Sequence, residues 1–188
     1  MRIVAGDFRG RALAAPPGAA TRPTSDRARE AMFNVLEHAA WSPGVRRARV
    51  IDLFAGSGAL GLEALSRGAA FCLFVETDEA ARGAIRDNVE AFGVMGNTRV
   101  HRRDATSLGV RPGSAGEAFT LAFLDPPYGR GLGERAIAGL LAGDWLSPDA
   151  IVVLERGAAE PMPDLPGLEL VDERSYGAAR VSFHRRAG

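Results

Sequence analysis

The sequence predicts an α/β fold built on a mostly parallel β-sheet. Short apolar runs alternate with helical stretches from Val50 onward, which is the pattern of successive strand–helix–strand units. A glycine-rich turn follows the first of these runs, and the C-terminal segments alternate as an antiparallel hairpin does. With 188 residues, the chain is long enough for one domain with a sizeable core and too short for two full ones.

The N-terminal quarter precedes this alternating part. Residues 2–6 and 10–14 flank a short turn, and this spacing predicts a small β-hairpin. A Pro-Pro-Gly break follows, after which Ser25 or Asp26 can cap a helix that runs to about His38.

We expect the chain to consist of an N-terminal extension, residues 1–20, and a main domain, residues 21–188. Strands are predicted near residues 49–54, 71–76, 98–102, 119–124 and 150–155. Helices are predicted near residues 59–67, 78–92 and 132–142. A terminal hairpin is predicted from residues 168–175 and 179–185. A parallel sheet with such an ending favours a methyltransferase that uses S-adenosylmethionine over a dinucleotide dehydrogenase.

Charge is distributed unevenly along the chain, although its formal net charge is zero. Residues 1–49 hold nine arginines against four acidic residues, an excess of five positive charges. A basic N-terminal quarter predicts a docking surface for a polyanion, because each phosphate neutralised by arginine releases counterions. A solvated charged face is the alternative interpretation. The chain has no lysine, so arginine would make any phosphate contacts.

The composition argues against several other classes of protein. No apolar run approaches the roughly 18 residues of a membrane span, and no apolar leader follows the first charges, so we expect a cytoplasmic protein. Cys72 is the single cysteine and lies in an apolar run, which predicts a core residue without a disulfide. The three histidines are scattered without ligand spacing, and we therefore expect no metal site.

The glycine-rich turn is the candidate cofactor site. Gly56, Gly58 and Gly61 match the spacing GxGxxG, and Glu76 follows about twenty residues later at the end of the next predicted strand. Glycines let the chain turn tightly and approach a ligand, while a carboxylate at that position accepts hydrogen bonds from ribose hydroxyls. The same pattern describes a NAD site, so it does not choose the cofactor.

Two further acidic residues favour S-adenosylmethionine as that cofactor. Asp52 lies at the end of the first strand, where a carboxylate suits an ammonium and a sulfonium but would repel a pyrophosphate. Asp104 follows the third strand and could accept a hydrogen bond from the adenine amine, with the Ala105 amide nearby. A simple loop cap is the alternative for Asp104. The full set of predicted cofactor residues is Asp52, Phe54, Ala55, Gly56, Ser57, Gly58, Glu76, Asp104 and Ala105.

The tetrapeptide Asp125-Pro126-Pro127-Tyr128 is the candidate catalytic motif. It stands at the carboxyl end of the predicted fourth strand, the edge at which open α/β sheets bind ligands. Two prolines remove two amide donors, so carbonyl oxygens and the Asp125 carboxylate face a substrate that donates hydrogens. An exocyclic amine of a nucleobase is such a substrate, and Tyr128 offers a ring on which the base stacks, worth about 1–3 kcal/mol. The alternative is a Pro-Pro loop with the tyrosine packed into the core.

The motifs together closely resemble the RsmD family of bacterial 16S ribosomal RNA guanine-N2 methyltransferases. The resemblance runs almost the whole length of the chain. It is carried by the segments 1–6, 8–11, 22–27, 29–30, 52–68 and 125–128. The opening segments make it specific, since the Asp-Pro-Pro-Tyr motif alone indicates amino-methyltransferases in general.

This resemblance implies a class I, Rossmann-like methyltransferase fold with seven strands and an N-terminal extension that helps to bind RNA. It implies S-adenosylmethionine as the donor. It implies as the acceptor a guanine N2, at position 966 of 16S ribosomal RNA, in an assembling small ribosomal subunit. We expect a monomer without metal or membrane contact. The candidate residues for phosphate contact are Arg2, Arg9, Arg11, Arg22, Arg27 and Arg29, although Arg22 could instead brace the cofactor pocket.

Other functions remain open from the residues alone. An adenine-N6 methyltransferase of DNA or RNA uses the same motif, although the chain lacks a separate target-recognition domain of the usual size. A protein glutamine methyltransferase also acts on a planar amide nitrogen. A non-catalytic RNA-binding assembly factor with the same fold, or a NAD-dependent dehydrogenase, is formally possible.

Overall fold

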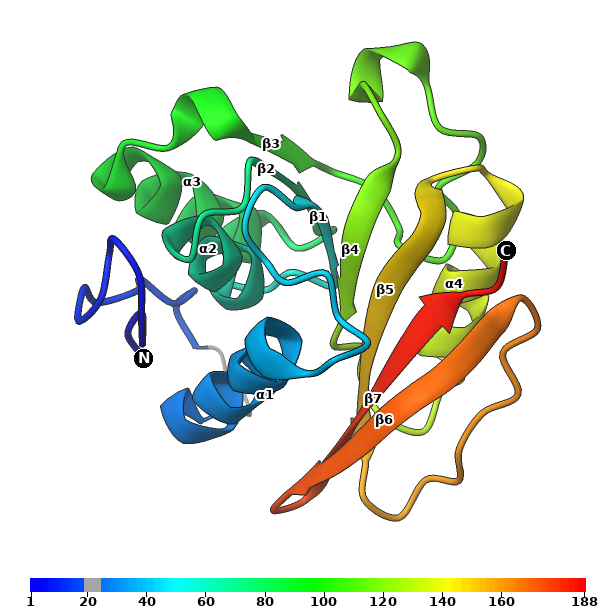
Figure 1. The fold of residues 1–188 in the computed structure, drawn as a ribbon. Coiled ribbons are helices and arrows are strands. Elements are labelled where there is room, and N and C mark those ends of the chain that lie inside the picture. The colour runs from blue at the N-terminus through cyan, green and yellow to red at the C-terminus, as the bar shows by residue number, and fades with distance from the viewer. Residues whose placement is uncertain (19–24) are drawn as a thin grey trace.

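A seven-stranded sheet forms the centre of the part of the chain that the computed structural model describes, residues 1–18 and 25–188 (Figure 1). The strands are β1 (Arg49–Leu53), β2 (Phe71–Val75), β3 (Thr98–His101), β4 (Phe119–Leu124), β5 (Leu146–Gly157), β6 (Leu168–Tyr176) and β7 (Ala179–Arg186). Their order is β3-β2-β1-β4-β5-β7-β6. The first five strands pair in parallel, and β7 pairs antiparallel with both β5 and β6.

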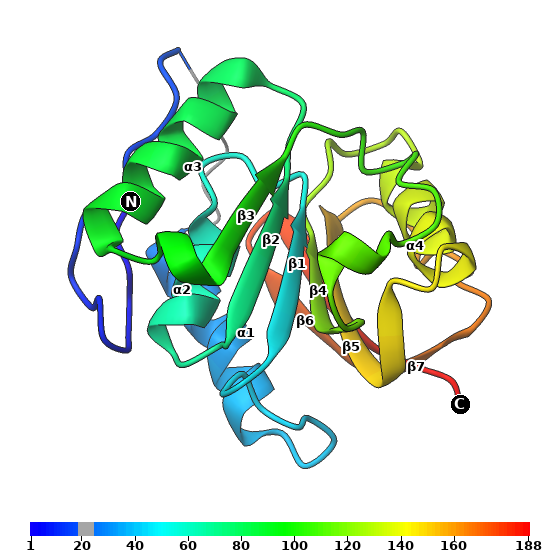
Figure 2. The ribbon, with the colours of Figure 1, turned by 90° about the horizontal axis from the view of Figure 1, so that it is seen from above.

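Helices cover both faces of the sheet (Figures 1 and 2). They are α1 (Asp26–His38), α2 (Ala59–Ser66), α3 (Glu79–Phe92) and α4 (Leu132–Ala142), with short 3-10 turns η1 (Met95–Asn97) and η2 (Gly113–Ala115). One core cluster joins α1, α2 and α3 to one face, and a second joins α4 to the other. Because the central strands are buried on both faces, they read as nearly continuous apolar runs in the sequence.

The helix starts follow local capping chemistry. The Ser25 side chain accepts a hydrogen bond from the Ala28 amide at the start of α1, and Asp78 does the same for the Ala81 amide at the start of α3. The predicted alternation of strands and helices is confirmed, with most boundaries within two residues.

Strand β5 begins earlier than predicted. It starts at Leu146, whereas the apolar pattern begins at Ala150. The residues between them are exposed or half-buried, and the β4–β5 register shifts between Phe119 and Leu121. The alternation of apolar and polar residues does not reveal a strand segment in which the pairing with the neighbouring strand is irregular.

The N-terminal extension doubles back as predicted but forms no regular strand in residues 1–18. A single antiparallel bridge joins Arg2 and Ala12, and the Ile3 amide donates to the Arg11 carbonyl at 2.9 Å. Ile3 and Leu13 are buried in the same core cluster as α1 and α2. The extension therefore shares the main core and lies against α2 and α3 (Figure 2). The division proposed at residue 20 falls outside the described residues.

Candidate active site at the sheet edge

Three carboxylates converge at the carboxyl ends of β1, β2 and β4. Asp52 lies in β1, Glu76 follows β2 and Asp125 follows β4, and parallel pairing brings these ends to one edge of the sheet. Burial raises the pKa of Asp52 well above its ordinary value, and the charges of Asp125 and Glu76 raise it further. The edge therefore favours a positively charged ligand over an anion.

The turn after β1 has the backbone of a ligand cradle. Phe54 has a φ of 58°, the left-handed region that a bulky residue rarely adopts, and Gly56 follows with a φ of 56°. A Cβ atom on Gly56 would meet nothing within 4 Å, so its backbone borders open space. Gly58 ends the turn with a φ of 81°, directly before α2. Ala55 and Ser57 complete the turn and are buried.

The third glycine of the motif packs the helix rather than facing a ligand. A Cβ atom on Gly61 would lie 2.4 Å from Cε1 of Phe74 and 2.5 Å from Sγ of Cys72. The glycine therefore lets α2 approach β2 closely. Cys72 is a buried free cysteine, as the sequence predicts.

Asp52 lies beneath the turn. Its side chain is buried, with the residue 1% exposed, and its Oδ2 accepts a hydrogen bond from the Gly61 amide at 3.0 Å. Asp52 is absent from the residues that line the neighbouring pocket. The Asp52 carboxylate thus fixes the start of α2 from beneath the turn, and its contact with a cofactor ammonium stays a prediction.

A pocket of about 590 Å³, partly open to solvent, includes four of the eight other predicted cofactor residues. It is lined by Phe54, Val75, Glu76, Thr77, Arg103, Asp104, Ala105, Thr106, Pro127 and Leu132. These residues come from the segments after β1, β2, β3 and β4, which are far apart in the sequence.

Backbone contacts hold two of the pocket carboxylates in place. Glu76 accepts hydrogen bonds from the amides of Gly56 at 2.8 Å and Asp78 at 2.9 Å, which ties it to the glycine-rich turn. Asp104 accepts from the hydroxyl and the amide of Thr106 at 2.7 and 2.8 Å, and these bonds lower the pKa of Asp104. Asp104 therefore does cap its own loop, and the same loop presents it to the pocket.

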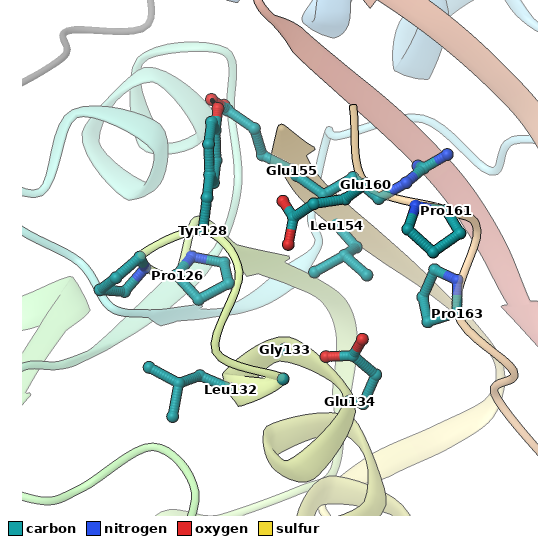
Figure 3. Close-up of a pocket in the computed structure, with 13 residues that line it drawn as sticks. Pro126, Tyr128, Leu132, Gly133, Glu134, Leu154, Glu155, Glu160, Pro161 and Pro163 are labelled. Atoms are coloured by element: carbon teal, nitrogen blue, oxygen red, sulfur yellow. Dashed lines mark hydrogen bonds between the residues drawn. The ribbon is translucent and has the colours of Figure 1, made fainter. Parts of the chain in front are cut away.

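A second pocket of about 460 Å³ adjoins this one and is lined in part by Pro126, Pro127 and Tyr128 (Figure 3). The two pockets share Pro127 and Leu132. Tyr128 is half-buried and lines the second pocket, so it is not packed into the core. Its hydroxyl donates a hydrogen bond to Oε1 of Glu155 at 2.6 Å.

The sequence analysis missed the glutamates of this second pocket. Glu155 ends a predicted strand beside the strand of Asp125, so the rule that parallel strand ends meet at one edge could have found it. Glu160 accepts the Gly129 amide at 2.7 Å and the Gly157 amide at 2.6 Å. It braces two loops in a way that no local pattern predicts.

The candidate phosphate-contacting arginines differ in exposure. Arg2, Arg9 and Arg27 are exposed. Arg11 is also exposed, but its guanidinium lies 4.4 Å from the centre of the Phe92 ring. Arg22 lies outside the described residues.

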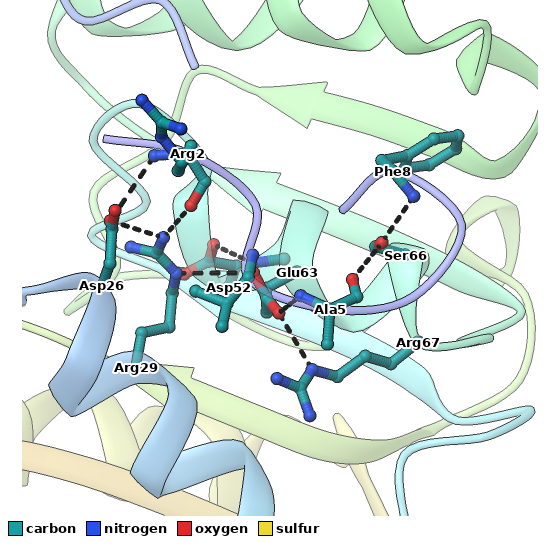
Figure 4. Close-up of polar contacts among 11 residues, drawn as sticks. Arg2, Ala5, Phe8, Asp26, Arg29, Asp52, Glu63, Ser66 and Arg67 are labelled. Atoms are coloured by element: carbon teal, nitrogen blue, oxygen red, sulfur yellow. Dashed lines mark hydrogen bonds and ion pairs between the residues drawn. The ribbon is translucent and has the colours of Figure 1, made fainter. Parts of the chain in front are cut away.

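The structure does not support the prediction that Arg29 contacts RNA phosphates. It is 0% exposed, and its guanidinium pairs with Asp26 at 3.0 Å and Glu63 at 3.5 Å and donates to the Arg2 carbonyl (Figure 4). A buried, paired guanidinium cannot reach an RNA phosphate. Arg29 instead joins α1 to the N-terminal extension.

Glu63 is the centre of this buried cluster (Figure 4). It is 0% exposed and accepts hydrogen bonds from the Val4 amide at 2.9 Å and the Ala5 amide at 3.1 Å. Arg67 donates to the same carboxylate at 2.9 Å. Since Glu63 belongs to α2, the extension is anchored on the helix that starts at the glycine-rich turn.

The described residues contain neither a helix that could cross a membrane nor a metal-type group of three or more His, Cys, Asp or Glu side chains.

The sequence of this chain matches one protein family and several named relatives. A family model described as "Conserved hypothetical protein 95" matches residues 1–185. Ribosomal RNA small subunit methyltransferase D of Escherichia coli K12 is 39% identical over 187 residues, which cover 99% of this chain and 90% of that protein. Its namesake in Haemophilus influenzae is 33% identical, covering 98% and 93%.

A solved structure supports the same relation at the level of the fold. The Escherichia coli protein yhhF, provisionally described as a methyltransferase, matches with a TM-score of 0.84 and 36% identity, covering 99% of this chain and 97% of that one. The predicted class I methyltransferase fold, mostly parallel with an antiparallel C-terminal hairpin, is confirmed.

Proposed function

We propose that this chain is a ribosomal RNA methyltransferase. It belongs to the Conserved hypothetical protein 95 family, which is the RsmD family that its sequence resembles. Its acceptor is the exocyclic N2 amine of a guanine in the small-subunit RNA, and its donor is S-adenosylmethionine. One observation carries the proposal. Four of the predicted cofactor residues line one pocket, and Pro126, Pro127 and Tyr128 of the Asp-Pro-Pro-Tyr motif line an adjacent pocket that shares Pro127 with the first. Asp125 directly precedes these prolines at the end of β4.

The first pocket fits S-adenosylmethionine by the chemistry of its donors and acceptors. Glu76 would accept from the ribose hydroxyls, and Asp104 with Ala105 would meet the adenine. The open space beside the Gly56 backbone leaves room for the rest of the donor. The carboxylates at the strand ends suit its positive charge. When bound, S-adenosylmethionine supplies an electrophilic methyl group.

The residues of the Asp-Pro-Pro-Tyr loop would hold the acceptor. The Asp125 carboxylate and the Pro126 carbonyl accept the two amine hydrogens and direct the nitrogen lone pair out of the base plane. Tyr128 supports the base by stacking. Such alignment of reacting groups can contribute about 7–11 kcal/mol, and the methylated amine releases its proton without a strong base.

The choice of substrate rests on the relatives and on charge. The named relatives are small-subunit ribosomal RNA methyltransferases. The exposed arginines Arg2, Arg9 and Arg27 give the N-terminal part a surface that suits RNA phosphates. We propose guanine 966 of 16S RNA, within an assembling small subunit, as the target.

The test is methyl transfer in vitro with tritiated S-adenosylmethionine. Purified protein is incubated with naked small-subunit RNA or with small-subunit particles from a strain that lacks the gene. Digested nucleosides are then identified by mass spectrometry. N2-methylguanosine at one position is the expected product. N6-methyladenosine would instead identify an adenine methyltransferase, and no incorporation into either substrate would indicate a non-catalytic assembly factor.

A further inference from the structure

Glu155 is a carboxylate that the proposed transfer has not used. It lies near the carboxyl end of β5. The last paired residues of β4 and β5 are Leu124 and Leu154, which directly precede Asp125 and Glu155. Glu155 is only 7% exposed, and it lines the same pocket as Pro126 and Tyr128. A carboxylate buried to this degree beside a substrate pocket calls for a specific partner.

Tyr128 holds this carboxylate at the edge of its ring (Figure 3). Its hydroxyl donates to Oε1 of Glu155 at 2.6 Å, a short bond of the charge-assisted kind. Gly157 lies against the ring, since a Cβ atom there would be 3.0 Å from Cδ2 and 3.5 Å from Cε2 of Tyr128. Ring and carboxylate thus form one braced unit, which offers a stacking surface with an acceptor at its rim.

Two other glutamates line this pocket and differ from Glu155. Glu160 is engaged through both oxygens by the amides of Gly129 and Gly157, so it serves the loops. Glu134 is exposed in the first turn of α4. Of the three, Glu155 is the one that combines burial with a bond to the stacking residue.

Guanine and adenine differ at the atom beside the amine. Guanine presents N1–H next to its N2 amine, so the edge is a row of donors. Adenine presents an unprotonated N1, an acceptor, next to its N6 amine. A second carboxylate beside Asp125 would complete the recognition of guanine and oppose the lone pair of adenine N1. A carboxylate accepts about four hydrogen bonds over its two oxygens, so one carboxylate can accept from the Tyr128 hydroxyl and from a base together.

We propose that Glu155, positioned by the Tyr128 hydroxyl, accepts the N1–H of the target base and thereby selects guanine over adenine. This inference rests on the proposed function, because it assigns a specificity residue to the same acceptor pocket. It also explains how a motif shared with adenine-N6 enzymes could serve a guanine.

The test replaces the target guanine with 2-aminopurine, which keeps the 2-amine and lacks N1–H. Small-subunit RNA is assembled by ligation with a synthetic segment that carries either base at the modified position. The ratio of the two transfer rates is then measured for the wild type and for Glu155→Gln. The wild type should prefer guanine, and Glu155→Gln should reduce that preference by about 10- to 100-fold, because the new amide can donate to N1 of 2-aminopurine.

Glu117→Gln is the matched control, since it makes the same chemical change at an exposed glutamate that lines neither pocket. It should leave the ratio unchanged. Tyr128→Phe keeps the ring and removes the hydroxyl that holds Glu155, and it should lower the ratio in part. Thermal unfolding and affinity for S-adenosylmethionine check that each variant is folded.

The outcomes separate this inference from the proposed function. A folded Glu155→Gln protein with the wild-type ratio would overturn the role of Glu155 while leaving the methyltransferase intact. If that variant does not fold, an unchanged ratio in Tyr128→Phe has the same consequence. Wild-type protein that methylates no guanine would instead refute the proposed function.

Discussion

At the scale of single residues, burial separates the roles of carboxylates that look equivalent in the sequence. Asp52 is covered by the glycine-rich turn and fixes the start of α2. Glu76 is held by two backbone amides at the rim of the cofactor pocket. Asp125 is half-buried at the end of β4, next to the two prolines. Asp125 is the one that we propose to hold the amine.

Replacement of Asp125 should separate chemistry from cofactor binding. Asp125→Ala removes the acceptor that orients the amine, so the transfer rate should fall at least 10²- to 10³-fold, the usual cost of one such electrostatic group. Affinity for S-adenosylmethionine should stay within a few-fold. Single-turnover transfer and calorimetric titration measure the two quantities. A loss of cofactor affinity as large as the loss of rate would contradict this division.

At the scale of the elements, the glycine-rich motif serves two purposes. Gly56 and Gly58 have positive φ values and shape the turn, whereas Gly61 lets α2 pack on β2. The motif therefore serves the packing of α2 as well as the turn.

Gly61→Ala should destabilise the protein by about 1–3 kcal/mol, because the added methyl group would lie 2.4 Å from Phe74. Gly83→Ala in α3 is the matched control. A Cβ atom there would meet nothing within 4 Å, so this variant should gain about 0.5–1 kcal/mol of helix stability. Urea unfolding measures both. Equal stability of the two variants would mean that α2 shifts at no cost.

The antiparallel end of the sheet contains a buried histidine that makes stability depend on pH. His184 in β7 is 3% exposed and lies 2.9 Å from the Ser182 hydroxyl. Burial, with the charge of Arg156 as the next cause, lowers the pKa of His184 from 6.5 to about 4, while Glu173 opposes the shift. The folded protein therefore resists protonation of His184, and the unfolded chain does not.

Stability from neutral His184 should be present above about pH 6.5 and be lost as the pH falls towards 4. Between about pH 7.5 and 5, the free energy of unfolding should fall by about 2 kcal/mol more in the wild type than in His184→Gln. Urea unfolding at both pH values provides the comparison, in which the other titrating groups cancel. Parallel pH profiles for the two proteins would rule out this role.

At the scale of the whole molecule, the N-terminal extension and α2 form one structure. Glu63 joins the extension to α2, and Arg29 joins it to α1. The exposed Arg9 and Arg27 are carried on this anchored part. The proposed RNA surface is thus braced against the helix that begins at the glycine-rich turn.

Arg9→Gln combined with Arg27→Gln should weaken RNA binding and lower its salt dependence, by about one unit of slope for each arginine that no longer neutralises a phosphate. Binding to small-subunit RNA over a series of salt concentrations gives that slope. Arg174→Gln is the control, because this exposed arginine lies on β6, at the opposite edge of the sheet. A slope that changes only in the control would move the docking surface to that edge.

The order of the elements and the edge of the sheet that carries the candidate site could be predicted, because their signals are local. The strands around Val50 and Leu121 are buried on both faces, so they form apolar runs that a linear reading detects. The start of β5 was missed because polar residues and irregular pairing interrupt the pattern. The prediction of a β-hairpin in the extension was only partly right, since a single bridge, and no regular pair of strands, joins its two arms.

What the sequence determined by itself was the fold class, the family and the edge of the sheet that carries the candidate site, because periodicity and strand-end motifs are properties of neighbouring residues. Only the tertiary structure decided that Arg29 is buried, that Asp52 lies under the turn and that Glu155 faces Tyr128. Each of these depends on packing between segments distant in the chain. Burial and partner, which set what a charged side chain can do, are absent from any local pattern.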